Sequence, residues 1–254
     1  HMWLVDYRDL IWNLTISDLK VKYQSSVLGF AWSLLNPLLM MLVLYFVFIN
    51  VFRLDQENFA LYLLIGIIVW RFLANGTTMA MGSIVGRPGL VTKLYIPRQI
   101  LVMSSVLSSF ISSILEFAVL IPLLFILGAK VTPNILFFPI VHGIYFLIVY
   151  GASLVLAAFF VYFRDLNQVW DVVMQAGFFL SPIVYPISVI PAAFLDYYML
   201  NPMTVLIETY RRFLLYGGTP SPMGLFFLLA VGVVMVAAGA LVFKRLERRF
   251  AEEI

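Results

Sequence analysis

The chain of 254 residues is 63% hydrophobic and only 11% charged, and its mean hydropathy is +1.01, which excludes an ordinary soluble domain. It contains no cysteine, which excludes disulfides, thiolate metal sites and cysteine nucleophiles. The net charge of +3 is small, so the positions of the charges carry more information than their sum. We expect an all-α polytopic membrane protein in which residues 1–254 form a single transmembrane domain.

Residues 3–23 have the pattern of an amphipathic helix. The apolar residues Leu4, Tyr7, Ile11 and Leu14 recur every three or four positions among charged and amide side chains, which places them on one helical face. We expect this helix to lie in the membrane interface, with tryptophan at the depth of the lipid headgroups. A helix that docks onto a soluble partner is the alternative, and the two roles are compatible.

Six apolar stretches follow, and at ~1.5 Å per residue they are long enough to span about 30 Å of hydrocarbon. They cover residues 28–51, 59–85, 100–127, 135–163, a stretch that begins at Asn167, and residues 223–243. Two charged residues, Arg71 and Glu116, fall on neighbouring spans, and we hypothesise that they form an ion pair because an unpaired charge in hydrocarbon is costly. Two rows of serines on the third span predict close contact with another helix.

The fifth span carries polar residues on one face. Gln168, Asp171 and Gln175 are three and four positions apart, so they share a helical face. Polar groups at membrane depth are expensive unless they face protein or water. We therefore expect this face to lie toward the interior of a bundle or toward a pathway.

Prolines break the chain between the fifth and sixth spans, in residues 181–218. Asn201 and Pro202 are typical of a helix start. The helix that they begin is amphipathic, with Glu208, Arg211 and Arg212 on its polar face. Two short helices that are too broken to span predict re-entrant elements beside a pore. A surface loop with one interfacial helix is the alternative.

The basic residues predict the orientation. With the N-terminus in the cytoplasm, only Arg53, Lys130, Arg211 and Arg212 fall in outer segments. The other basic residues outside the spans fall in inner segments, as the positive-inside rule requires. Both termini are therefore expected on the cytoplasmic side.

Several kinds of chemistry are missing from the sequence. It contains no G-x-x-x-x-G-K-[ST] loop for nucleotide phosphates and no acidic cluster for Mg²⁺. We expect no catalytic residue, no metal site, no cofactor in this chain and no nucleic-acid partner, and we expect His142 to be a packed residue. The scattered Arg71, Glu116 and Asp171 leave a proton-coupled transporter as a rival hypothesis. The candidates to line a pathway are Trp32, Asn36, Tyr45, Gln168, Asp171, Gln175, Phe178 and Tyr185.

Motifs along nearly the whole chain resemble one family. They are Asp18-Leu19-Lys20-Val21-Lys22-Tyr23, Ser25-Ser26-Val27-Leu28-Gly29, Trp32, Pro37, Tyr162-Phe163-Arg164-Asp165-Leu166, Phe179 to Pro186, and Asn201-Pro202 followed by Arg211-Arg212. This pattern is similar to the ABC-2 type permeases that export polysaccharides, and most similar to the membrane subunits of O-antigen (lipopolysaccharide) exporters.

The resemblance implies a homodimeric channel in the bacterial inner membrane that rests on separate ATPase subunits, which hold ATP and Mg²⁺. It also implies that residues 86–99 form a cytoplasmic coupling loop and that residues 181–218 form an outer gate. The coupling candidates are Arg87, Leu90, Lys93, Leu94, Tyr95 and Arg98.

The cargo that the resemblance implies is a polysaccharide linked to undecaprenyl pyrophosphate. Lys20, Lys22, Arg87 and Arg98 are candidates to guide the pyrophosphate by charge attraction, and ordinary positive-inside bias is the alternative for each. Other ABC-2 permeases, for capsule, teichoic acid, a small lipid or a drug, remain open. So does a membrane enzyme that acts on the same lipid carrier.

Overall fold

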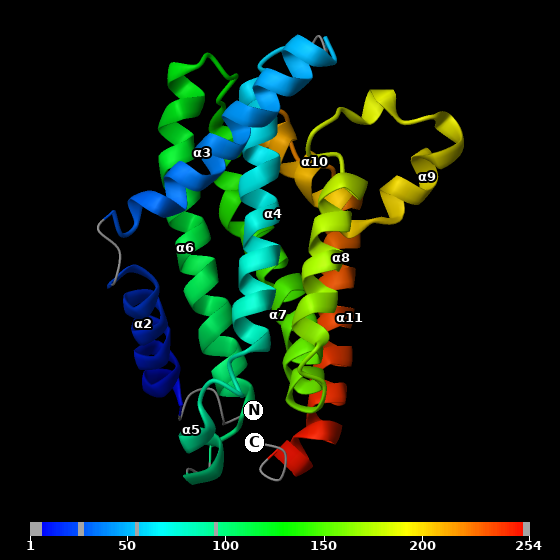
Figure 1. Cartoon of the computed structure of the whole chain (residues 1–254). Helices are drawn as coiled ribbons and strands as arrows, with labels where there is room; N and C mark the ends of the chain where they lie inside the picture. The colour runs from blue at the N-terminus through cyan, green and yellow to red at the C-terminus, as the bar shows by residue number, and fades with distance from the viewer. Residues whose placement is uncertain (1–6, 25–27, 54–55, 94–95, 251–254) are drawn as a thin grey trace.

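The computed structural model describes residues 7–24, 28–53, 56–93 and 96–250. This part of the chain is helical and contains no strand (Figure 1), which confirms the expected all-α class. The elements are α2 (Arg8–Gln24), α3 (Ala31–Phe46), η1 (Val47–Val51), α4 (Phe59–Met81), α5 (Pro88–Lys93), α6 (Gln99–Ile126), η2 (Pro133–Phe137), α7 (Phe138–Tyr162), α8 (Leu166–Leu180), η3 (Ile187–Val189), α9 (Ala192–Leu200), α10 (Pro202–Leu214), α11 (Pro222–Leu246) and η4 (Glu247–Arg249).

Five helical segments of the described chain are long and apolar enough to cross a membrane. They are Ala31–Val51, Phe59–Met81, Gln99–Ile126, Pro133–Tyr162 and Pro222–Arg249, and they coincide with five of the six predicted spans. At the place of the fifth predicted span, α8 has only 15 residues. At ~1.5 Å per residue it is shorter than the ~30 Å of a hydrocarbon core, so the count of six spans stays a prediction.

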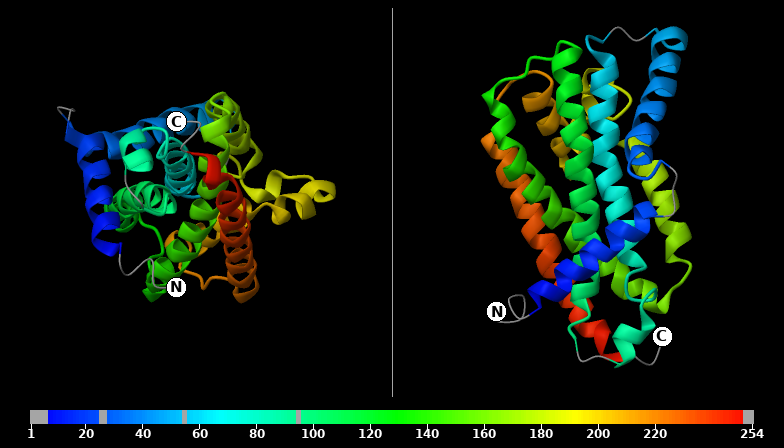
Figure 2. Two further views of the ribbon diagram at one scale, coloured as in Figure 1. Left: turned by 90° about the horizontal axis from the view of Figure 1, so that it is seen from below. Right: turned by 90° about the vertical axis from the view of Figure 1, so that its left-hand side faces the viewer.

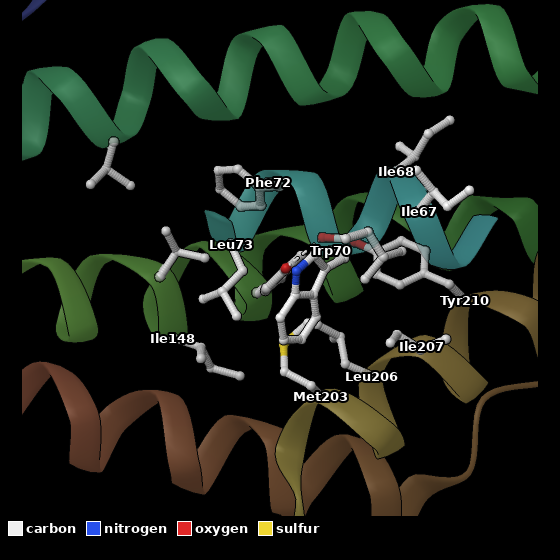
Figure 3. Packing of buried hydrophobic residues seen from close by; sticks show 14 of the residues in the cluster. Ile67, Ile68, Trp70, Phe72, Leu73, Ile148, Met203, Leu206, Ile207 and Tyr210 are labelled. Carbon is white, nitrogen blue, oxygen red and sulfur yellow. Dashed lines mark hydrogen bonds between the residues drawn. The ribbon is translucent and has the colours of Figure 1, made fainter. Parts of the chain in front are cut away.

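Helix α4 forms the centre of the bundle, because most of its residues are buried on all sides. Trp70 of α4 lies close to Met203 and Leu206 of α10, and Ile148 of α7 belongs to the same hydrophobic core (Figure 3). A helix that is apolar all round is expected at such a position.

Helices α7 and α11 run side by side along the bundle, and two glycines allow this. A Cβ added to Gly151 would lie 2.4 Å from the carbonyl carbon of Met235, and one added to Gly239 would lie 2.5 Å from the carbonyl oxygen of Gly151. Small residues let the backbones of membrane helices approach in this way.

His142 is packed in an aromatic cluster, as expected. It is 1% exposed, its ring stacks on Phe110 and Phe138 with centroids 4.6 and 4.9 Å away, and its Nδ1 lies 2.7 Å from the hydroxyl of Tyr210 on α10. This contact ties α10 to α7. At the start of α10, the side chain of Asn201 accepts a hydrogen bond from the amide of Met203 at 3.0 Å, which confirms the predicted cap.

Helix α2 runs obliquely along the flank of α6 (Figure 2). It begins at the end of the bundle where α5 and η4 lie, and it ends roughly half-way along the bundle, where α3 begins (Figure 1). One helix therefore connects the region of the 86–99 loop to the middle of the molecule.

Three helices leave much of their surface uncovered. Of α3 only Ser33, Pro37 and Met41 are buried, while α8 and α9, whose residues are all described, contain no buried side chain. The polar side chains Gln168, Asp171 and Gln175 of α8 are exposed, on a surface that the rest of this chain does not cover.

Candidate functional site

A polar cavity of about 460 Å³ opens between the end of α2, the start of α3 and the second half of α4. The residues that line it include Lys22, Trp32, Ser33, Asn36, Arg71 and Asn75. Amide, hydroxyl and cationic groups converge there beside an indole ring. This combination can bind a polar group attached to an apolar body.

Arg71 enters the cavity from α4 and pairs with Glu116 of α6, as hypothesised. The Nη2 to Oε1 distance is 3.4 Å, and the side chains are 21% and 4% exposed. The distance is long for a charged hydrogen bond, and Nε of Arg71 has no partner among the described residues. The guanidinium is therefore only partly satisfied by the carboxylate.

Lys22 enters the cavity from the last turn of α2, where α6 holds it. Its Nζ donates to Oγ of Ser112 at 3.4 Å, and the Tyr23 hydroxyl donates to the same oxygen at 3.0 Å. Ser33 of α3 then donates to the Tyr23 hydroxyl at 3.1 Å. One of the predicted serine rows thus holds α2 against α6.

The charges around the cavity do not cancel. Lys22 and Arg71 are the cations among its lining residues, and Glu116 is the carboxylate that pairs with Arg71. An excess positive charge in a region of low dielectric is costly and attracts an anion. The cavity therefore suits a ligand with a negatively charged group.

The described residues among the coupling candidates lie at one end of the bundle (Figure 1). Arg87 forms an ion pair with Asp18 of α2, and Arg98 donates to the carbonyl oxygen of Glu247 at 2.6 Å. Leu90 packs against the core and Lys93 is the last residue of α5, whereas Leu94 and Tyr95 lie outside the described residues.

Asp18 was absent from the candidates predicted from sequence, although it connects three elements. Its carboxylate pairs with Arg87 and accepts a hydrogen bond from Oγ of Ser105 on α6 at 3.2 Å. Burial raises the pKa of the Asp18 carboxyl above its usual value, and Arg87 and Ser105 partly offset this rise. The sequence signals were that Asp18 begins one of the motifs shared with the family, and that Asp18 and Lys22 are four positions apart and so share a helical face.

The predicted guiding residues separate in the structure. Lys22 lines the cavity, whereas Lys20 is exposed on α2. Arg87 and Arg98 are engaged with Asp18 and with the backbone of Glu247. Of the four, only Lys22 lines the polar cavity. Arg71 lines it too, although the sequence suggested for Arg71 only an ion pair or a proton relay.

The candidates for lining a pathway are also separated, and only two of them line the cavity. Trp32 and Asn36 line the cavity. Tyr45 lies further along α3, beside Phe59. On α8, Phe178 packs edge-on against Trp70 with centroids 6.2 Å apart, while Gln168, Asp171 and Gln175 point away from the bundle. The Tyr185 hydroxyl donates to the carbonyl oxygen of Phe179 at 2.8 Å.

The sequence placed Arg211 on the polar face of α10, and this expectation was wrong: Arg211 is 0% exposed. Its Nη2 donates to the carbonyl oxygens of Tyr62 and Ile183 at 3.0 and 2.9 Å. Its Nη1 donates to the carbonyl oxygen of Pro182 at 2.5 Å and to Glu208 at 2.8 Å. A guanidinium can satisfy several acceptors at once, so this one joins α4, α10 and the segment after α8.

Comparison with known proteins places these features in a wider group. The profile of a family described as ABC-2 type transporter matches residues 9–215. An O-antigen export system permease protein of Myxococcus xanthus is 32% identical over an alignment of 257 positions, which covers 99% of this chain and 97% of the relative. One from Klebsiella pneumoniae is 29% identical over 245 residues, 96% and 94% of the two chains. The polysialic acid transport protein of Escherichia coli is 19% identical over 238 residues, 92% of each.

Proposed function

Because the chain belongs to the ABC-2 type transporter family, we propose that it is the membrane subunit of an ATP-driven exporter of a lipid-linked polysaccharide. The cargo is O-antigen on undecaprenyl pyrophosphate, carried across the bacterial inner membrane. The names of two of these relatives, which are O-antigen export permeases, support the O-antigen cargo. The observation that carries the mechanism is the excess of positive charge in the polar cavity.

In this proposal residues 1–254 form one ABC-2 type transmembrane domain with six spans and both termini in the cytoplasm. Residues 3–23 form the interface helix, residues 86–99 the coupling loop and residues 181–218 the outer gate with two re-entrant helices. Helix α8 is then a short fifth span. The basic residues support the orientation, since the links at the end of the bundle near α5 and η4 contain Arg87, Arg98 and Arg164.

The proposed assembly contains two copies of this chain and two ATPase subunits, which supply the nucleotide and the Mg²⁺. The uncovered faces of α3 and α8 support the pairing of two copies. Gln168, Asp171 and Gln175 would then face the channel between them, where polar groups at membrane depth find water or a sugar chain.

The carrier enters from the cytoplasmic side and places its diphosphate in the polar cavity. Lys22 and Arg71 bind the phosphate oxygens there by charge-assisted hydrogen bonds, and Ser33 and Asn75 offer further polar groups. Trp32 provides an apolar surface for the isoprenoid or for a sugar ring. Hydrolysis of ATP in the partner subunit then moves the glycan outward.

The test uses cells in which the gene for this protein is deleted and replaced by a copy that encodes the Lys22→Gln or the Lys20→Gln variant. We expect Lys22→Gln to lower surface O-antigen by about tenfold, because one charge-assisted bond of roughly 1.5 kcal/mol is lost, and full-length lipid-linked glycan should accumulate inside. Lys20→Gln, on the exposed side of the same helix, should export normally. Equal export by the two variants would remove the cavity from the mechanism.

The same cells separate the rival functions. Without the protein, a glycan that is never synthesised would indicate an enzyme of its assembly. Normal synthesis and normal display would indicate a different cargo, such as a capsule polymer, teichoic acid, a small lipid or a drug.

A further inference from the structure

We propose that Asp18 is a positioning residue through which the 86–99 loop moves Lys22 and so controls the polar cavity. This inference rests on the proposed function, because it assigns the control of the proposed carrier site. The contacts that α2 makes at Asp18 and at Lys22 carry it.

Helix α2 joins the loop to the cavity along one face. Asp18 and Lys22 are four positions apart, so their side chains lie on the same side of the helix. Asp18 binds Arg87 in the link before α5, and Lys22 lines the cavity one turn further on. A displacement of Arg87 along the helix axis therefore reaches Lys22 through a single rigid turn.

The ion pair of α2 with the loop is stronger than any single polar contact that α2 makes with α6. The Asp18–Arg87 pair joins two opposite charges whose side chains are 11% and 22% exposed, so solvent screens it little. The polar contacts with α6 are hydroxyl bonds of 3.0 to 3.4 Å, from Thr15 to the carbonyl oxygen of Ser104, from Ser105 to Asp18, and from Lys22 and Tyr23 to Ser112. Such bonds are weak and easily exchanged for their neighbours.

The serines of α6 provide a surface along which α2 can shift. Ser105 and Ser112, which hold Asp18 and Lys22, are seven positions apart and so lie on the same face two turns from each other. Ser108 lies between them, and its buried hydroxyl has no partner among the described residues. A shift of α2 toward Ser108 exchanges one hydroxyl partner for another, so the free-energy cost of the shift is small. When the loop moves, α2 is therefore expected to follow Arg87.

The consequence is a link between ATP hydrolysis and the carrier site. Movement of the 86–99 loop against the ATPase shifts α2, and Lys22 then moves away from Arg71 or toward it. The two cations hold a diphosphate best when both reach it, so their separation sets the affinity of the cavity.

The first experiment measures ATP hydrolysis by the complete transporter in nanodiscs, with and without the undecaprenyl-pyrophosphate glycan. We expect Asp18→Asn to bind the carrier with an affinity within about twofold of the wild type, because Lys22 and Arg71 remain. The carrier-stimulated rate of ATP hydrolysis should fall by about tenfold, because the charge-assisted bond to Arg87 is lost. Asp9→Asn, an exposed acidic position on the same helix, is the control and should behave as wild type.

The reciprocal pair Asp18→Arg with Arg87→Asp separates coupling from folding. The pair restores the ion pair in the opposite sense, so we expect stimulation to return although each single variant lacks it. Normal stimulation in Asp18→Asn, or a double variant no better than its singles, would overturn the proposal. Absence of stimulation in the wild type would instead overturn the proposed function.

The second experiment observes the movement itself and does not depend on the cargo. Because the chain has no cysteine, nitroxide labels can be attached at Val21→Cys on α2 and Leu115→Cys on α6, which are 71% and 41% exposed. We expect the distance between the labels to change when the transporter binds ATP, and to stay fixed in Asp18→Asn. An unchanged distance in the wild type, or an equal change in both proteins, would contradict the role of Asp18.

Discussion

At the scale of single residues, the charges inside this protein have specific partners. Arg211 is fully buried and donates to three backbone carbonyls and one carboxylate. Gly66 of α4 makes room for it, because a Cβ at that position would lie 2.8 Å from Nη2 of Arg211. A buried charge of this kind is tolerated only when its donors are satisfied.

Replacing Arg211 by lysine should destabilise the protein strongly. Lysine keeps the charge but cannot place donors on both sides of a planar group, so we expect a loss of about 3 kcal/mol from the free energy of unfolding. Arg212→Lys, at the exposed neighbouring position, is the control and should change little. Denaturation in detergent measures both, and equal stabilities would contradict the role of Arg211 as a clamp.

Arg71 and Glu116 should show coupled effects. Neutralising one of them leaves a buried charge without its partner, at a cost of roughly 3 kcal/mol. Neutralising both, as Arg71→Gln with Glu116→Gln, removes that penalty, so the double variant should unfold less readily than either single one. A double-variant effect equal to the sum of the single effects would mean that the two charges do not interact.

At the scale of elements, close contact between helices depends on where small residues occur. Helix α7 contains two glycines that differ in surroundings: Gly151 lies against the backbone of α11, while a Cβ on Gly143 would meet nothing within 4 Å. The same substitution should therefore have opposite effects at the two positions.

We expect Gly151→Ala to destabilise the α7–α11 pair, because the added methyl group would lie against the backbone of Met235 and Val236. Gly143→Ala should be neutral or stabilising by up to about 1 kcal/mol, since alanine favours the helix. Thermal unfolding of the two variants distinguishes these effects. Similar midpoints would show that α11 can move aside.

At the scale of the whole molecule, the number of spans depends on whether α8 crosses the membrane. If α8 crosses the membrane, residues before it and after it must be accessible from opposite sides. The exposed Arg164 and Ser188 flank α8, and the cysteine-free chain allows each to be replaced by cysteine without a background signal.

We expect a membrane-impermeant thiol reagent to label Ser188→Cys in intact cells or spheroplasts and to label Arg164→Cys only after permeabilisation. This pattern follows from the positive-inside orientation together with a spanning α8. Labelling of both positions from one side would show that α8 does not cross, and it would reduce the span count to five.

The sequence by itself determined the helical class, the five long spans, the cap at Asn201 and the pairing of Arg71 with Glu116. These features depend on local signals or on simple costs: apolar length, helical periodicity, capping groups and the penalty for an unpaired charge in hydrocarbon. Each of them can be evaluated without knowing how the helices are arranged.

Only the tertiary structure decided which polar groups meet. Lys22, Trp32 and Arg71 come from three different helices, and their meeting depends on the oblique path of α2 along α6. In the sequence, Asp18 is one of several charges on an amphipathic helix, and only the fold places Arg87 beside it. Arg211 looked exposed by periodicity, because a helical pattern reports which face a side chain occupies but not whether another segment covers that face. The segment after α8 covers it, and its carbonyl groups are what make a buried guanidinium stable.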